Sequence, residues 1–231
     1  MRRSDINRAI VTAKAFFAAH QFQLPPFAHW PAAELGARLS PQSGIYRGRL
    51  GWDVTDFNEG DFARLGILLF TIRNGDKEML PTGRGRLYCE KLLFFTLGQG
   101  CPLHSHYVKT EDIINRGGGR LTLNLMAGDL RGNPRPGPAQ VLIDEEPLVF
   151  EGTAAVHLDP GQSIVLEPGI FHELKAEEGP VMLGEVSLVN DDLKDNIFLT
   201  PLARFSGVEE DEPPLHLLCA DYDRVVGAAQ V

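Results

Sequence analysis

Residues 98–111 of this chain read Gly-Gln-Gly-Cys-Pro-Leu-His-Ser-His-Tyr-Val-Lys-Thr-Glu, and three glycines follow at residues 117–119. Side chains alternate along an extended strand, so His104 and His106 would project from the same face of one strand. Two imidazoles followed by the carboxylate of Glu111 can occupy three positions around a divalent transition metal. The stretch therefore predicts a β-strand that carries a metal site.

The parity of these three positions predicts an irregularity in the chain. His104 and His106 are even-numbered and Glu111 is odd-numbered, so a regular strand would send the carboxylate to the opposite face. If all three are ligands, the chain must bulge or turn between residues 107 and 110. The same irregularity would bring Lys109 to the metal-facing side, which makes this lysine a candidate for chemistry.

A second stretch, at residues 161–172, supplies a fourth candidate ligand. It reads as a strand, a Pro-Gly turn and then His172, and a strand that runs into such a turn would hold the histidine rigidly. A His-x-His pair alone is more often a pair of exposed strand residues, and the third histidine argues against that interpretation here. The other histidines are expected to be surface or packing residues, namely His20, His29, His157 and His216.

The two stretches together resemble the two motifs of the cupin superfamily. Gly98, the two histidines, Glu111 and Gly118 match every position of the first motif. The second motif matches at its first glycine, at its Pro-Gly turn and at His172, with one extra residue before the proline and with Ala176 in place of an asparagine. The resemblance implies a cupin-type double-stranded β-helix, or jelly roll, with a metal inside it, and it implies nothing about the reaction.

The rest of the chain predicts strands after a helical preface. Apolar residues recur at helical spacing over residues 6–17, and a second short helix is expected over residues 31–39 with a proline at its start. Apolar runs bounded by glycine and polar turns predict at least eight strands, at residues 52–55, 66–72, 87–95, 121–125, 140–143, 154–158, 163–166 and 181–186. We expect an all-β antiparallel double sheet, with residues 1–45 as an N-terminal helical extension and residues 46–231 as the cupin barrel with a C-terminal segment.

Composition limits the possible partners and the compartment. The chain has 231 residues, of which 43% are hydrophobic and 23% charged, as in a globular protein. Its net charge of −9 argues against nucleic-acid binding, which needs a basic face. No apolar run approaches the roughly 20 residues of a membrane span. Three cysteines without zinc-ribbon spacing favour the reducing cytoplasm.

Two further charged residues are candidates for chemistry inside the barrel. If residues 172–185 form a hairpin that turns at residues 177–180, Glu185 lies opposite His172 with Cβ atoms about 5 Å apart. A carboxylate there could act as a catalytic base or simply hydrogen-bond a ligand histidine. Lys91 lies beside Glu90 in an apolar strand, so one of the two must point inward or into a subunit interface. An ion pair within the sheet and a substrate role are equally open for Lys91.

Stretches along nearly the whole chain resemble the bacterial D-lyxose isomerases, namely residues 25–28, 50–55, 71–75, 111–119, 184–192 and 209–213. The resemblance implies a manganese-dependent aldose–ketose isomerase that converts D-lyxose to D-xylulose and also accepts D-mannose. It further implies a homodimer that acts on a small-molecule monosaccharide. The His and Glu set would also accept cobalt, nickel, iron or zinc.

The candidate residues suit this chemistry. An aldose–ketose interconversion moves a proton between C1 and C2 through a cis-enediol, which requires a Lewis acid and a base within about 3 Å of the carbon. We assign Glu185 as the leading base, with Lys109 or Lys91 polarising or protonating a sugar oxygen.

Several alternatives stay open at this point. The same four ligands would suit a cupin dioxygenase that uses iron, and a non-catalytic sugar-binding cupin is the second alternative. Asp191 and Asp192 could bind sugar hydroxyls or cap a turn. The acidic run at residues 209–212 is typical of a solvated loop.

Overall fold

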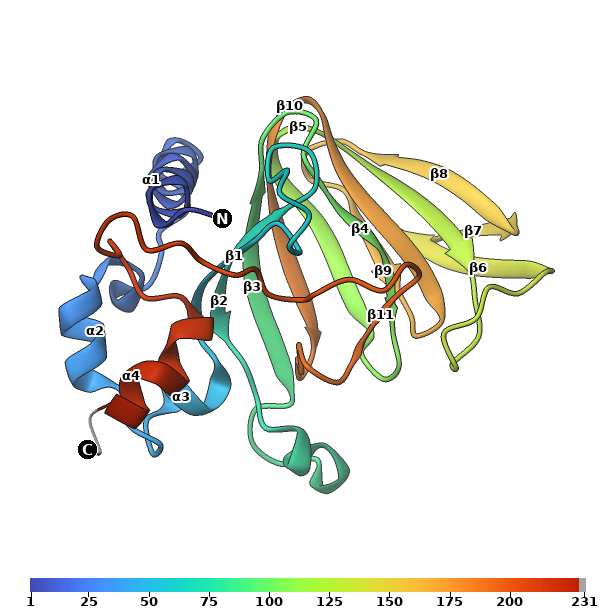
Figure 1. Cartoon of the computed structure of the whole chain (residues 1–231). Helices are drawn as coiled ribbons and strands as arrows, with labels where there is room; N and C mark the ends of the chain where they lie inside the picture. The colour runs from blue at the N-terminus through green and yellow to red at the C-terminus, as the bar shows by residue number, and fades with distance from the viewer. Residues whose placement is uncertain (229–231) are drawn as a thin grey trace.

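Two long antiparallel strands, β5 (Glu111–Ala127) and β10 (Ile170–Leu188), form the centre of the barrel, as Figure 1 shows. The structure is a computed structural model that describes residues 1–228, so the last three residues of the predicted barrel domain lie outside the described residues. Each long strand bends and takes part in both halves of the rolled sheet.

Antiparallel neighbours extend from β5 and β10 in both directions. One half of the sheet follows the order β1 (Gly51–Thr55), β2 (Ile67–Arg73), β3 (Tyr88–Phe95), β10, β5, β9 (Ser163–Leu166), β6 (Pro138–Ile143) and β7 (Glu146–Glu151). The other half follows the order β11 (Asn196–Phe198), β4 (Gly100–His106), β10, β5 and β8 (Thr153–Leu158). The predicted all-β antiparallel double sheet is confirmed.

The predicted hairpin between His172 and Glu185 is wrong. Residues 177–180 have the composition of a turn, Glu-Glu-Gly-Pro, but β10 continues through them as one strand. Positive φ angles at Glu178 (60°) and Gly179 (144°) bend the strand there instead of reversing it. His172 and Glu185 therefore lie on the two arms of one bent strand.

Gly118 and Gly119 of β5 leave room for this bend. A Cβ atom at Gly118 would lie only 2.1 Å from the carbonyl oxygen of Pro180, so a larger residue would push the two bending strands apart. Beyond the bend, β10 pairs with β3 on its other side, and Glu185 faces Lys91 in that pairing.

Two large apolar cores and a smaller one between α2 (Ala32–Arg38) and α4 (Tyr222–Ala228) hold the elements together. The largest fills the barrel between the sheet halves and includes Leu93, Leu123 and Ile164. The second lies on the outer face of β1, β2 and β3, which α1 (Arg3–Ala19) covers with one apolar side (Figure 1). That side consists of Ile6, Ile10, Ala13 and Phe17, each fully buried, and burial of each large member contributes about 1.5–3 kcal/mol. The predicted first helix is confirmed.

Short helices complete the outside of the barrel. These are α2 (Ala32–Arg38), α3 (Gly44–Gly48), α4 (Tyr222–Ala228), η1 (Pro26–His29), η2 (Lys77–Thr82) and η3 (Cys219–Asp221). The predicted second helix is present as α2, which begins one residue after Pro31. Among the described helices, none combines the length and the apolar character needed to span a membrane.

The acidic run at residues 209–212 is more than a solvated loop. Glu210 accepts two hydrogen bonds from the buried guanidinium of Arg3, with the shorter at 2.7 Å. Asp211 accepts a hydrogen bond from the backbone N–H of Ser4 at 2.9 Å, so it caps the first turn of α1 from a distant part of the chain. The run therefore attaches the N-terminal helix to the C-terminal segment.

Candidate active site

Four side chains converge inside the barrel at the junction of its two halves. His104 and His106 come from β4, Glu111 is the first residue of β5, and His172 lies near the start of β10. One potential ligand atom from each of the four lies within 4.8 Å of the others. Residues 107–110 form the turn between β4 and β5, so the irregularity predicted from parity is present.

The three imidazoles are oriented by backbone carbonyl groups. Each Nδ1 faces a carbonyl oxygen, at 2.8 Å for His104, 3.3 Å for His106 and 3.1 Å for His172. A carbonyl can only accept, so the proton of each neutral ring lies on Nδ1 and the lone pair lies on Nε2. The three lone pairs are therefore free to bind a metal, in the arrangement that ligand histidines usually have.

The donor set fits a cation. The Nε2 atoms of His106 and His172 are buried and have no hydrogen-bond partner among the described residues. Glu111 Oε1 lies 3.3 Å from the first and 2.9 Å from the second, but an acceptor oxygen cannot satisfy a nitrogen lone pair. A divalent metal between these atoms would satisfy all of them. Three imidazoles and one carboxylate are donors that such a metal prefers.

The pKa values favour the form of the cluster that binds a metal. Burial, and then the neighbouring imidazoles, hold the pKa of His104 well below its ordinary value. Burial also lowers the pKa of His106, assisted by the charge of Lys109. Burial alone would raise the pKa of Glu111, but Lys109 and His106 outweigh it and hold that pKa well below the ordinary value. Neutral His104 and His106 therefore coexist with an ionised Glu111 at neutral pH.

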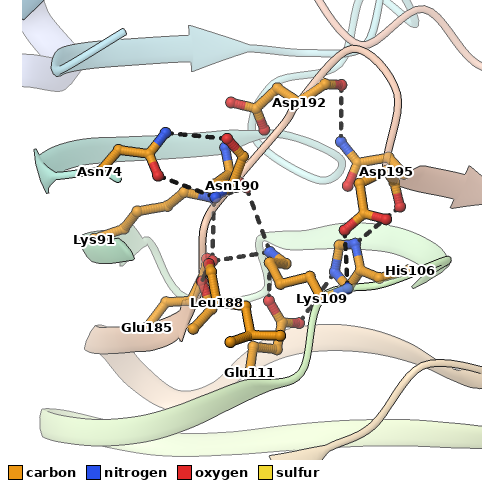
Figure 2. Close-up of polar contacts among 12 residues, drawn as sticks. Asn74, Lys91, His106, Lys109, Glu111, Glu185, Leu188, Asn190, Asp192 and Asp195 are labelled. Carbon is orange, nitrogen blue, oxygen red and sulfur yellow. Dashed lines mark hydrogen bonds and ion pairs between the residues drawn. The ribbon is translucent and has the colours of Figure 1, made fainter. Parts of the chain in front are cut away.

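A buried chain of charges continues from the cluster (Figure 2). The Lys109 Nζ atom lies 2.6 Å from Glu111 Oε2 and 2.9 Å from Glu185 Oε1. Lys91 Nζ lies 3.1 Å from the same Glu185 oxygen. Burial would raise the pKa of Glu185, but Lys109 and Lys91 lower it overall, and the carboxylates in turn raise the pKa of both lysines against the effect of burial. All four groups are thus charged at neutral pH.

Of the two alternatives for Lys91, the ion pair within the sheet is present, formed with Glu185, and the structure adds an amide to it. Asn190 Oδ1 accepts a hydrogen bond from Lys91 Nζ at 2.8 Å and lies 3.5 Å from Lys109 Nζ. Asn74 holds Asn190 in place, because its side-chain oxygen accepts from the Asn190 N–H and its amide donates to the Asn190 carbonyl, both at 3.0 Å (Figure 2).

The four candidate metal ligands line a cavity of about 50 Å³ together with Lys91, Lys109 and Glu185, and Asp192 and Arg204 line it as well. Arg204 Nη2 donates to Asp53 Oδ2 at 2.6 Å and to Asp192 Oδ1 at 3.1 Å. Asp192 also lines a larger outer cavity of about 820 Å³, where Asp191 lies too. Asp192 therefore lies between the two spaces, while Asp191 faces only the outer one and pairs with Lys77.

Sequence reasoning missed Arg204, which lines the cavity, and Asp53, which pairs with it. Asp53 had a usable signal, because it is a carboxylate in the middle of the apolar strand β1 and must therefore find a buried partner. Arg204 lies in an irregular segment whose composition carries no such signal. Of the remaining histidines, His20, His29 and His157 are exposed, and His216 donates to a backbone carbonyl away from the cluster.

The fold and the four-residue cluster define a cupin with one candidate metal centre. Two solved structures show the same fold: the L-ribose isomerase of Acinetobacter sp. DL28, with a TM-score of 0.60 and 14% identity, and that of Cellulomonas parahominis, with a TM-score of 0.59 and 16% identity. Each match covers 90% of this chain and 98% of the other. The predicted cupin-type barrel is confirmed.

The sequence comparisons identify the family. The family model described as D-lyxose isomerase matches residues 1–222. The "D-lyxose/D-mannose isomerase" of Serratia proteamaculans is 43% identical over 98% of this chain and 100% of its own length. The protein of the same name from Escherichia coli O157:H7 is 40% identical over 96% of this chain and 98% of its own length. The chain belongs to the D-lyxose isomerase family.

Proposed function

We propose that this chain is a metal-dependent aldose–ketose isomerase that converts D-lyxose to D-xylulose and D-mannose to D-fructose. The observation that carries the proposal is the convergence of three imidazole lone pairs and the Glu111 carboxylate beside the buried pair of Lys109 and Glu185. Family membership and the names of the two bacterial relatives support the choice of sugars.

The metal ligands in this proposal are His104, His106, Glu111 and His172. A divalent ion bound there would supply a Lewis acid that polarises the sugar carbonyl and stabilises negative charge on the enediol oxygens. We propose manganese as the ion, because nitrogen and oxygen donors suit it and the family resemblance implies it, although the same donors would accept cobalt, nickel, iron or zinc.

Glu185 is the base in the proposed reaction. Its carboxylate takes the proton from C2 of the aldose and returns it to C1 on the same face of the cis-enediol, while the hydroxyl proton on O2 is transferred to O1, which yields the ketose. Lys109 and Lys91 keep this carboxylate ionised at neutral pH, because their charges outweigh the effect of burial on its pKa. Either lysine can donate a hydrogen bond to a sugar oxygen next to the reacting carbons.

Asp192 and Arg204 are proposed to bind hydroxyl groups at the far end of the sugar. Both line the small cavity, and the Nη1 atom of Arg204 is buried without a hydrogen-bond partner among the described residues. A sugar hydroxyl can accept from Arg204 and donate to Asp192, which would satisfy both groups. This assignment gives Asp192 a sugar-binding role and leaves Asp191 as the residue that pairs with Lys77 at the surface.

We propose a homodimer in the cytoplasm. The family resemblance supports the dimer. The compartment is supported by the cysteines Cys89, Cys101 and Cys219, which are free and buried. Burial raises the pKa of Cys89 and of Cys101 to about 12, so neither is a reactive thiol at neutral pH.

The test is a screen of aldopentoses and aldohexoses in deuterated water. The metal-stripped protein is assayed alone and with each divalent cation restored, with and without oxygen. We expect no turnover without metal, and full turnover with manganese under anaerobic conditions, with ketose formed from D-lyxose and D-mannose and deuterium incorporated next to the carbonyl. An oxygen requirement would favour the cupin dioxygenase, and sugar binding without deuterium incorporation would favour the sugar-binding module.

A matched pair of histidine variants links the activity to the cluster. His172→Ala removes one ligand, and we expect it to lose both metal binding and turnover. His157→Ala removes an exposed histidine of β8, which hydrogen-bonds to Thr122, and we expect it to keep both. Equal metal content in the two variants would contradict the proposed ligand set.

A further inference from the structure

The segment that follows β10, residues 189–196, runs beside the candidate site, and its residues Asp192 and Asn196 line the cavity (Figure 2). Asp195 lies at the end of this segment and is 8% exposed. Its carboxylate accepts hydrogen bonds from three consecutive backbone N–H groups, those of Tyr107 at 3.1 Å, Val108 at 2.9 Å and Lys109 at 3.0 Å. One buried carboxylate thus anchors nearly the whole turn between β4 and β5.

The backbone of Asp195 adds a second pair of contacts to the same turn. Its carbonyl oxygen lies 3.3 Å from Nδ1 of His106 and accepts the N–H of Tyr107 at 3.3 Å. Because this carbonyl fixes the proton on Nδ1, the Nε2 lone pair of His106 is left to face the cluster. Asp195 therefore contacts the turn through its side chain and orients a candidate ligand through its main chain.

The turn needs such an anchor for two reasons. Within four residues it must change which side chains, even- or odd-numbered, face the site. Its N–H groups therefore fall outside the regular hydrogen-bond ladders of β4 and β5 and need other acceptors. It must also direct the Lys109 side chain inward, where Nζ meets both Glu111 and Glu185. A shift of about 1 Å in such a group can cost on the order of 100-fold in rate.

We propose that Asp195 is a positioning residue for the isomerase reaction, which holds Lys109 between Glu111 and Glu185 by anchoring the turn at residues 107–109. This inference rests on the proposed function. The Asp195 side chain does not line the cavity and therefore acts through the turn that it anchors. A carboxylate that merely caps a loop would instead contribute to stability alone.

Asp129 provides a matched control that distinguishes a positioning role from a loop cap that only stabilises the fold. Its carboxylate also accepts backbone N–H groups of a loop, those of Arg131 at 2.8 Å and Asn133 at 2.9 Å. Asp129 lies outside the cavity, and its hydrogen bonds among the described residues go to residues 131–133 of its own loop. Asp129→Asn thus removes an equivalent cap at a place where the inference predicts no effect on turnover.

The first measurement is amide hydrogen exchange, which requires neither metal nor sugar. In Asp195→Asn one acceptor oxygen becomes an NH₂ group that faces a donor, so the turn loses part of its anchor. We expect the amides at residues 107–109 to exchange at least about tenfold faster, with the amides of β4 and β5 unchanged. Asp195→Ser, which keeps one acceptor on a shorter side chain, is the second variant if Asp195→Asn does not fold. Unchanged exchange at these amides would overturn the inference.

The second measurement is a double-mutant cycle with Lys109→Met. We expect Asp195→Asn to lower kcat by about 10- to 100-fold with KM within about threefold of the unmodified protein, and Asp129→Asn to leave both unchanged. In the Lys109→Met background, Asp195→Asn should lower kcat by less than about twofold, because the group that it positions is already absent.

Two outcomes of the cycle would overturn the inference: an undiminished effect of Asp195→Asn in the Lys109→Met background, or an unchanged kcat in the single variant. Failure of the proposed function has a separate readout, since it would appear as a lack of isomerisation by the unmodified protein. In that case faster amide exchange at residues 107–109 would still show that Asp195 anchors the turn, but a role of Asp195 in this reaction would be refuted.

Discussion

Replacing Glu185 with glutamine removes the proposed base and keeps its shape. Glu185 Oε1 lies 2.9 Å from Lys109 Nζ and 3.1 Å from Lys91 Nζ, and a glutamine carbonyl in the same position can still accept from both. It cannot take up a proton from a carbon. The substitution therefore separates proton transfer from sugar binding more cleanly than a truncation would.

The expected loss follows from the role of the group. A positioned general base contributes about 10²- to 10⁴-fold to a rate, so Glu185→Gln should lower kcat by that factor, or raise the barrier by about 2.7–5.4 kcal/mol. KM should stay within about threefold, since the metal ligands and the hydroxyl-binding groups are intact. Stability should fall by about 2 kcal/mol, because Lys91 and Lys109 lose a shared buried counter-ion but keep an acceptor.

The assay follows deuterium exchange and ketose formation with D-lyxose, at a temperature where circular dichroism shows the variant folded. The matched control is Glu90→Gln on β3, one residue from Lys91. Glu90 points outward and pairs with Arg73 at 3.0 Å, so its variant should turn over normally. Normal turnover by Glu185→Gln, with normal manganese content, would refute the assignment of Glu185 as the base. It would also refute a catalytic role for the ion pairs of Glu185 with Lys109 and Lys91.

Three further outcomes are expected. Because the pKa values of His104 and His106 are lowered, these ligands stay neutral below the ordinary histidine pKa of 6.5. Calorimetry should therefore show the affinity for manganese falling by less than about fivefold from about pH 7.5 to about pH 6.0. Two unshifted imidazoles would give a fall of about 14-fold, which would contradict the burial argument. Lys91→Met removes a charge that lowers the pKa of Glu185, so the acid limb of the kcat/KM profile should move to higher pH, and an unmoved limb would contradict that electrostatic role. Arg3→Met removes a buried guanidinium shared by two carboxylates far from the cavity, so urea unfolding should show a loss of about 2–3 kcal/mol while kcat stays unchanged.

The metal cluster was accessible to sequence reasoning because its information is local. His104 and His106 share a strand face by spacing alone, and the parity of Glu111 then requires a turn before it. His172 follows a Pro-Gly turn that ends a strand. None of these inferences depends on knowing how distant segments meet, and the convergence of the four side chains agrees with all of them.

The rest of the site depends on contacts between distant and irregular segments. Arg204 meets Asp53 across 151 positions of sequence, and Asp195 meets Lys109 across 86. Both Arg204 and Asp195 lie outside regular strands, where no periodicity indicates which way a side chain points. The acidic run at residues 209–212 is an exposed loop as expected, but its contacts with α1 were not predicted for the same reason, since these partners lie at the opposite end of the chain.

A change in which positions of β10 face inward explains how Glu185 reaches the site, although the predicted hairpin is wrong. On β10 the buried, inward positions are even-numbered from His172 to Ala176 and odd-numbered from Val181 to Glu185. The bend at residues 177–180 makes this change, and the strand pairing shifts register there. A regular strand would have turned either His172 or Glu185 outward.

The chain thus changes its strand parity at two places near the site. The turn at residues 107–110 changes parity between His106 and Glu111, and the bend in β10 changes it between His172 and Glu185. Each break brings an odd-numbered carboxylate to the side of an even-numbered imidazole, and Lys109 joins the two carboxylates. The proposed chemistry therefore depends on the two places where regular strand structure fails. One break is anchored by a buried carboxylate, and the other packs against Gly118 and Gly119.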